Sequence, residues 1–163
     1  MDQKQEIEAS DRKAVDALYR ISTLSGNEQD PMEALEGILD EVINLFGANS
    51  ASICLVNANS DKLLIEVERG LSKARKGFEL PMGVGITGWV ALYGEPFLSS
   101  NVLEEEKYFA LDDRIRSEMA APLIEGGRTV GALNVDSFEI NAFDGNDLRL
   151  LCLLYTSPSP RDA

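Results

Sequence analysis

Three glycines stand in the middle of the chain in a G-x-G-x-x-G pattern, at Gly83-Val84-Gly85-Ile86-Thr87-Gly88, directly before Trp89. Glycines before a helix leave its first backbone N–H groups uncovered. These groups are unpaired and lie at the positive end of the helix dipole. The segment Gly85–Trp89 is therefore predicted to hold a carboxylate or another small anion. The alternative is a tight turn that only packs the helix on a sheet.

Aromatic and polar side chains near this motif complete a candidate pocket for a small molecule. Apolar walls with a few polar groups are typical of such pockets. Core packing explains each side chain separately, so the prediction rests on the set. The predicted ligand-binding residues are Gly85, Ile86, Thr87, Gly88, Trp89, Phe97, Ser99, Asn101, Tyr108 and Met119.

The residue types that are missing exclude several chemistries. The chain has no histidine, which removes Ser-His-Asp and Cys-His catalysis, His-ligated haem and His-containing zinc sites. Cys54 and Cys152 are far apart in sequence and are expected to be reduced core thiols. The clusters Glu104–Glu106 and Asp112–Asp113 lack the pattern of a calcium loop and are expected to be solvated. We expect no cofactor, no metal and no enzymatic activity, with a thiol reductase using Cys54 or Cys152 as an alternative.

Charge and hydropathy set the expected compartment and partners. The formal net charge of −13 over 163 residues repels a phosphate backbone, so nucleic acid is not an expected partner. Residues 1–16 are polar and do not resemble a secretory signal, and no apolar run approaches the ~20 residues of a membrane helix. We expect a single cytoplasmic domain with no membrane partner.

Apolar periodicity and turn residues predict an α+β fold. Strands joined as hairpins form an antiparallel sheet, helices near both chain ends can cover one face, and the irregular middle from about Gly70 to Ser117 is left for the other. A dinucleotide fold is disfavoured because it needs parallel strands around the glycines. The predicted elements are a helix from Asp30 to Gly47, strands at Ser52–Asn57, Lys62–Arg69, Phe78–Leu80, Phe97–Ser99, Met119–Ile124 and Thr129–Val135, a short helix within Gly83–Gly94, a partly helical Glu104–Arg116 and a last helix from Asp144.

The two ends of the chain are predicted to differ from its centre. Ile7, Ala14 and Ile21 are seven residues apart, which fits either a surface helix or a two-helix dimer seam. Residues 155–163 change abruptly in composition and are expected to be a truncated or non-native tail. The predicted organisation is an N-terminal helix over 1–29, a sensor domain over 30–154 and this tail.

An ordered set of segments resembles the GAF domain family. They are Gly83–Val90, Gly94–Phe97, Ala121–Leu123, Gly131–Ser137 and Phe143 with Asp147, Leu148 and Leu151, within roughly Asp30–Leu154. The resemblance implies a central antiparallel sheet of about six strands, with terminal helices on one face and a ligand pocket on the other. It also implies a small-molecule-binding regulatory module of a signal-transduction protein, which dimerises through its helices and acts on an output domain outside this fragment.

Departures from the family pattern exclude several classes of ligand. Cyclic-nucleotide-binding members carry N-K-F-D-E, which has no equivalent here, and bilin-binding members resemble a Cys–His pairing that this chain lacks. Methionine-sulfoxide-reducing members need pocket cysteines, and Gly83–Val90 has none. The expected partner is an unidentified small molecule, with an anion favoured by the glycine motif. A ligand-free dimerisation or relay module is the alternative.

Overall fold

The computed structural model describes residues 31–57, 59–72 and 77–155. The predicted helix over residues 1–29 and the predicted tail beyond Tyr155 lie outside the described residues, so the dimer seam and the non-native end stay predictions. Within the described ranges, each helix is too short or too polar to cross a membrane.

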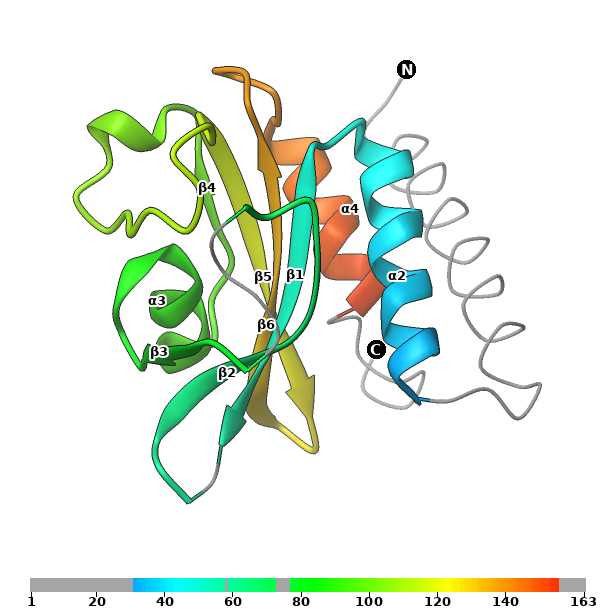
Figure 1. Cartoon of the computed structure of the whole chain (residues 1–163), viewed down its shortest axis with the longest axis vertical. Coiled ribbons are helices and arrows are strands. Elements are labelled where there is room, and N and C mark those ends of the chain that lie inside the picture. Colours follow the sequence, from blue (N-terminus) through cyan, green and yellow to red (C-terminus); the bar gives the residue numbers. More distant parts are fainter. Residues whose placement is uncertain (1–30, 58, 73–76, 156–163) are drawn as a thin grey trace.

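One antiparallel sheet of six strands forms the centre of the molecule, in the order β3-β2-β1-β6-β5-β4 (Figure 1). The strands are β1 Ser50–Asn57, β2 Lys62–Arg69, β3 Glu79–Pro81, β4 Phe97–Ser99, β5 Ser117–Glu125 and β6 Arg128–Ser137. The helices are α2 Pro31–Phe46, α3 Gly85–Tyr93 and α4 Gly145–Tyr155, and Val102–Glu104 forms the 3-10 turn η1. The two predicted hairpins, β1–β2 and β5–β6, are joined through the β1–β6 pair, so the predicted α+β architecture is confirmed.

The helices near the two ends of the described chain, α2 and α4, cover one face of the sheet (Figure 1). We call this side the α2/α4 face. Its core contains Leu39 and Val42 of α2, Leu151 of α4 and, from the strands, Ile53 and Leu133, all of them buried. Burial of such side chains is the main favourable contribution to folding.

Local signals in the sequence fix where these two helices begin and end. Gly47 has a φ of +63° directly after α2, which is the left-handed conformation expected of a glycine that ends a helix. At the start of α4, the Asp144 N–H donates to the Asp147 carboxylate and the Asp147 N–H donates to the Asp144 carboxylate, both at 2.9 Å. The predicted capped start is therefore confirmed, in a reciprocal arrangement that satisfies two helix N–H groups.

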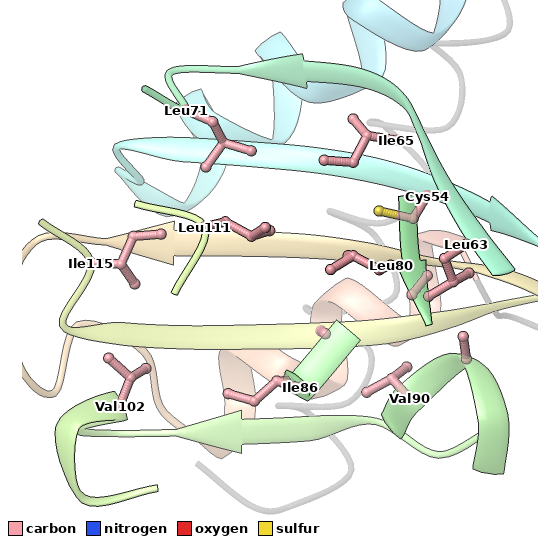
Figure 2. Close-up of a cluster of buried hydrophobic side chains, with 13 residues drawn as sticks. Cys54, Leu63, Ile65, Leu71, Leu80, Ile86, Val90, Val102, Leu111 and Ile115 are labelled. Carbon is pink, nitrogen blue, oxygen red and sulfur yellow. The ribbon is translucent and has the colours of Figure 1, made fainter. Parts of the chain in front are cut away.

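Helix α3 and the irregular middle of the chain cover the opposite side, the α3 face (Figure 1). Figure 2 shows the apolar cluster on this side, in which Ile86 and Val90 of α3 lie with Leu111 and Ile115 of the connection to β5. The strands around the glycine motif are antiparallel, which confirms that the motif is not part of a dinucleotide-binding unit.

The segment predicted to be partly helical, Glu104–Arg116, contains only the end of η1. Its backbone bonds are those of turns: the Tyr108 N–H donates to Glu105 O and the Ile115 N–H donates to Asp112 O, each at 3.2 Å. The Asp112 carboxylate also accepts from the Arg114 N–H at 3.0 Å. Short acidic side chains that accept hydrogen bonds from nearby backbone N–H groups compete with helix formation. In this segment such local hydrogen bonds form and the predicted helix does not.

Candidate functional site

Four neighbouring strands bring one polar residue each into a single row on the α3 face. In the register of the sheet, Ser99 of β4 lies opposite Glu118 of β5, Glu118 opposite Asp136 of β6, and Asp136 opposite Ser50 of β1. All four residues are buried. Since cross-strand neighbours on one face are close enough to interact, this row concentrates two carboxyl groups inside the protein.

The two carboxyl groups, Glu118 and Asp136, are called the acid pair below. Asp136 accepts hydrogen bonds from the Ser50 hydroxyl at 3.0 Å and from the Asn134 amide at 3.0 and 3.1 Å. Burial raises the pKa of Asp136 to about 6, while hydrogen bonds from Glu118, Ser50 and Asn134 oppose the shift. Burial raises the pKa of Glu118 well above its usual range, and the negative charge of Asp136 raises it further. Burial and the closeness of the two groups therefore both oppose full ionisation of the pair.

A second row beside the acid pair contains polar atoms with no partner in the described structure. Asn134 lies opposite Ala120 on one side and opposite Ser52 on the other, and Phe97 follows at the edge. The Ser52 hydroxyl and the Asn134 side-chain oxygen are buried and have no nitrogen or oxygen partner, and the Cys54 thiol lies near the Ser52 hydroxyl. Buried polar atoms are almost always satisfied, so these two atoms beside a buried carboxyl pair are exceptional.

The predicted anion cradle lies against the acid pair. Gly85, Ile86 and Thr87 at the start of α3 line a void of about 10 Å³ together with Glu118. The helix begins without a side-chain cap, at Val84. The positive end of α3 thus shares this void with a carboxyl group of the protein itself, and the void has room for about one water molecule.

The glycines of the motif are required for close packing. Gly85 has a φ of +74°, and a Cβ there would lie 3.0 Å from the Cβ of Phe109. A Cβ at Gly88 would lie 2.9 Å from the carbonyl oxygen of Pro81. Gly88 therefore has the packing role that the sequence left open, whereas Gly85 brings the start of α3 against the segment that carries Phe109.

Trp89 and Phe97 form an aromatic cluster at the edge of the α3 face. Their ring centroids are 5.4 Å apart, and Tyr93 lies 5.2 Å from Trp89. The Lys107 ammonium group lies 5.5 Å from the Trp89 centroid and 5.0 Å from the Phe97 centroid. The two predicted pocket aromatics are thus together, and a cation of the chain occupies the site that they form.

Residues 105–116, the roof segment, cross the α3 face and include the predicted site residue Tyr108. Burial raises the pKa of the Tyr108 phenol, and the negative charges of Glu118 and Asp136 add to the shift. The expectation that Asp112 is solvated is wrong: its side chain is 1% exposed and forms an ion pair of 2.7 Å with Arg114. That pairing holds the pKa of Asp112 well below its usual range.

The remaining predicted site residues lie in different places. Ser99 belongs to the polar row and, with Asn101, also lines an open groove of about 470 Å³. The Asn101 side chain accepts from the Leu103 N–H at 3.1 Å and so caps η1. The placement of Met119 in the pocket is wrong, because its side chain is fully buried in the α2/α4 core. Successive strand residues point to opposite faces, so Glu118 is the neighbour that reaches the α3 face.

Sequence reasoning missed the central residues of the site, Glu118, Asp136, Asn134, Ser50 and Ser52. The signal was present as alternation: polar residues occupy every second position in Ser50–Cys54 and in Asn134–Asp136, between apolar ones. Alternation of this kind normally indicates a solvated face. Only the register, which opposes Glu118 and Asp136 and buries both, shows that these residues form an internal site.

The described residues also bear on metal binding and on thiol chemistry. No group of three Asp, Glu, Cys or His side chains in this part of the chain converges to hold a metal ion. Cys54 lies on the α3 face with Ala120 and Ala132, whereas Cys152 packs against the α2/α4 core. Burial raises the pKa of the Cys54 thiol to about 12, so it stays protonated at neutral pH.

Similar solved structures include both GAF domains and enzymes. A free methionine-R-sulfoxide reductase from Neisseria meningitidis, in complex with its substrate, is 26% identical, with a TM-score of 0.76 over 86% of this chain and 83% of that chain. The GAF domain of a phosphoenolpyruvate-protein phosphotransferase from Coxiella burnetii is 17% identical, with a TM-score of 0.78 over 88% and 89%. The fRMsr of Staphylococcus aureus, in complex with substrate, is 18% identical, with a TM-score of 0.70 over 86% and 90%. No curated protein sequence matches the chain.

These structures correct one prediction. The expectation of no enzymatic activity is wrong, because methionine-R-sulfoxide reductases are among the proteins with this fold. The expectation depended on the absence of histidine and on the lack of cysteine in Gly83–Val90. That lack concerns one edge of the α3 face, and the thiol of Cys54 lies elsewhere on the same face.

The profile of the GAF domain family matches residues 28–156, which is most of the chain. The fold of the chain agrees with that of the Coxiella burnetii GAF domain named above. The chain therefore belongs to the GAF domain family.

Proposed function

We propose that this GAF domain is a regulatory module that binds a small molecule carrying an ammonium group, and that the acid pair receives this group. The observation that carries the proposal is the burial of two carboxyl groups, those of Glu118 and Asp136, opposite each other in the β5–β6 register. Charged groups are rarely buried unless they are paired. A cation supplied by a ligand completes the pairing that the described residues leave open.

The charge of the site favours one positive charge and argues against the anion suggested by the glycine motif. Burial raises the pKa of both carboxyl groups of the acid pair, because negative charge is poorly solvated there. A carboxylate or phosphate placed beside it would add a like charge in a poorly solvated position. An ammonium group adds the opposite charge.

The hydrogen-bonding groups also match an ammonium group. Asp136, the Asn134 side-chain oxygen and the Ser52 hydroxyl all accept hydrogen bonds, and the last two have no partner. An ammonium group has three donors and no acceptor. Donors are what this site lacks, so such a group satisfies the unpartnered atoms and the charge together.

Thermal shift with matched ligands tests this proposal. The probes are L-methionine, L-methionine sulfoxide and other small amino acids, each compared with its N-acetyl derivative, which lacks the ammonium group. A ligand at 100 times its Kd stabilises the folded state by about 2.7 kcal/mol. We expect a shift with at least one free amine, none with its acetylated form, and loss of the shift in Glu118→Gln.

Glu125→Gln is the matched control, because Glu125 ends the same strand and is exposed. It should keep the full shift. If no free amine stabilises the wild type, or if an acetylated compound stabilises it equally, the ammonium proposal is wrong.

A second candidate function is reduction of a sulfoxide, which the similarity to the Neisseria reductase favours. The Cys54 thiolate would attack the sulfoxide sulfur, giving the thioether and a cysteine sulfenic acid. Two equivalents of an external thiol would then regenerate the cysteine and release a disulfide and water. Because the pKa of Cys54 is about 12, the rate should be low at pH 7 and rise with pH.

Turnover of methionine sulfoxide with dithiothreitol as reductant checks this second function. Cys54→Ser should abolish the activity and Cys152→Ser should retain it. Equal activity in wild type and Cys54→Ser would exclude a nucleophilic role for Cys54. Ligand stabilisation without turnover would leave binding as the function.

A further inference from the structure

The roof segment, residues 105–116, closes the acid pair off from solvent. Phe109 and Leu111 of this segment line the void beside Glu118. The void of about 10 Å³ holds one water at most. A larger group can reach Glu118 through this void only if part of its lining moves, so the attachment of the roof segment bears on access.

The first attachment is at Lys107, close to the start of the segment. Its ammonium group lies over the rings of Trp89 and Phe97 and 3.8 Å from the Glu105 carboxylate. The Lys107 side chain is 39% exposed. Cation–π contacts and ion pairs at such exposure contribute little, because water competes for the charge.

The second attachment is at Asp112, and it has more bonds and a buried carboxylate, although the Arg114 side chain is 55% exposed. Arg114 donates to the buried Asp112 carboxylate from Nε at 3.0 Å and from Nη2 at 2.7 Å, and the Ser72 N–H donates to it at 3.1 Å. Arg114 also donates to Gly70 O at 3.3 Å and lies 4.5 Å from the centre of the Phe138 ring. Breaking these contacts would leave the Asp112 carboxylate poorly solvated and without its hydrogen-bond partners.

We propose that the roof segment is a hinged cover of the acid pair, which opens at Lys107 and turns about Asp112. In the closed state the Lys107 cation occupies the Trp89–Phe97 site. In the open state it leaves that site, and residues 105–111 move away from Gly85 and the start of α3. The inference rests on the proposed function only for what enters, since the motion itself requires no ligand.

Amide hydrogen exchange of the ligand-free protein tests the hinge. The Lys107 and Tyr108 amides are bonded to Glu105 and report on the opening end. The Arg114 and Ile115 amides are bonded to Asp112 and report on the hinge. In Lys107→Gln we expect the first two to exchange roughly two- to five-fold faster and the last two to be unchanged.

Three variants distinguish loss of the Lys107 contact with the two rings from a general loss of charge or structure. Lys107→Arg keeps a cation over the rings and should exchange like the wild type. Lys62→Gln removes another partly exposed lysine, paired with Glu79 at 3.4 Å, and should also leave the roof segment unchanged. Phe97→Leu removes only the contact of Lys107 with one of the two rings and should accelerate exchange less than Lys107→Gln, and the double variant should match Lys107→Gln alone.

Several outcomes would overturn the hinge. They are unchanged exchange at Lys107 and Tyr108 in Lys107→Gln, equal acceleration at Arg114 and Ile115, or additive effects in the double variant. None of these outcomes depends on a ligand. The failure of the thermal shift would therefore leave the hinge standing, and the failure of the hinge would leave the ammonium proposal standing.

Discussion

On the four strands β4, β5, β6 and β1, alternate residues face opposite sides of the sheet. On the α3 face the row is Ser99, Glu118, Asp136 and Ser50; on the α2/α4 face the adjacent row is Leu98, Met119, Val135 and Ala51. Both rows lie largely out of solvent. One side of each strand therefore contributes apolar burial, which stabilises the fold. The other side buries the carboxyl groups of the acid pair, which lowers stability.

This contrast indicates a division of roles between the faces. A one-residue slip of register would exchange the two rows, so the apolar row fixes the register that assembles the acid pair. Residues that bind or react are commonly kept at some loss of stability. The α2/α4 face should therefore respond to substitution through stability, and the α3 face through binding and pH.

The largest expected effect is on the α2/α4 face. Leu133 of β6 is fully buried in that core. Leu133→Ala should lower the free energy of unfolding by about 2–5 kcal/mol, through lost transfer energy and the cavity that remains. Urea unfolding at pH 7 measures it, and Leu133→Ile, which conserves volume, should change stability by less than about 1.5 kcal/mol. A loss below about 1 kcal/mol in Leu133→Ala would remove the stability role of this face.

A slightly smaller effect is expected from the acid pair, and it depends on pH. Because the pKa of Asp136 is about 6 in the folded protein and 3.8 in a model peptide, the folded state binds a proton between these values that the unfolded state does not. Stability from this group is therefore present below pH 4 and is lost as pH rises through about 6. Two pKa units correspond to roughly 3 kcal/mol.

Asp136→Asn removes this titration. Relative to the wild type, the variant should gain roughly 3 kcal/mol in free energy of unfolding between pH 4 and pH 7. Urea unfolding of both proteins at four pH values across this range measures the difference. Parallel curves for the two proteins would show that the acid pair does not destabilise the empty α3 face.

The sequence predicts the fold well because the elements carry local signals. The predicted strands Lys62–Arg69 and Phe97–Ser99 agree with the observed bounds, and the caps at Gly47 and Asp144 are where turn and cap chemistry require them. The alternation along β5 places Met119 on the α2/α4 face and its neighbour Glu118 on the α3 face, which makes the prediction for Met119 wrong.

The site is harder to predict, because its parts come from separate strands. Glu118 and Asp136 are 18 positions apart and become neighbours only through the β5–β6 register. Their burial depends on the roof segment, whose structure comes from the contacts of Asp112 with Arg114 and Ser72 rather than from periodicity. A lone carboxylate in a sequence gives no sign of such partners, so it is normally taken as solvated.

The smallest expected effects come from two neighbouring residues on opposite faces. Ala51 and Ser52 follow each other in β1 and are both fully buried. Ala51→Ser places a hydroxyl among apolar groups and should lower the free energy of unfolding by about 1–3 kcal/mol. Ser52→Ala removes a hydroxyl that has no hydrogen-bond partner, so stability should be unchanged or higher by up to about 1 kcal/mol.

Urea unfolding of the two variants gives a direct comparison of the faces, because chain position, strand and size of the change are matched. If Ser52→Ala were as destabilising as Ala51→Ser, the hydroxyl would be satisfied in the empty protein, and the α3 face would lose one of the two unpartnered atoms that favour a ligand.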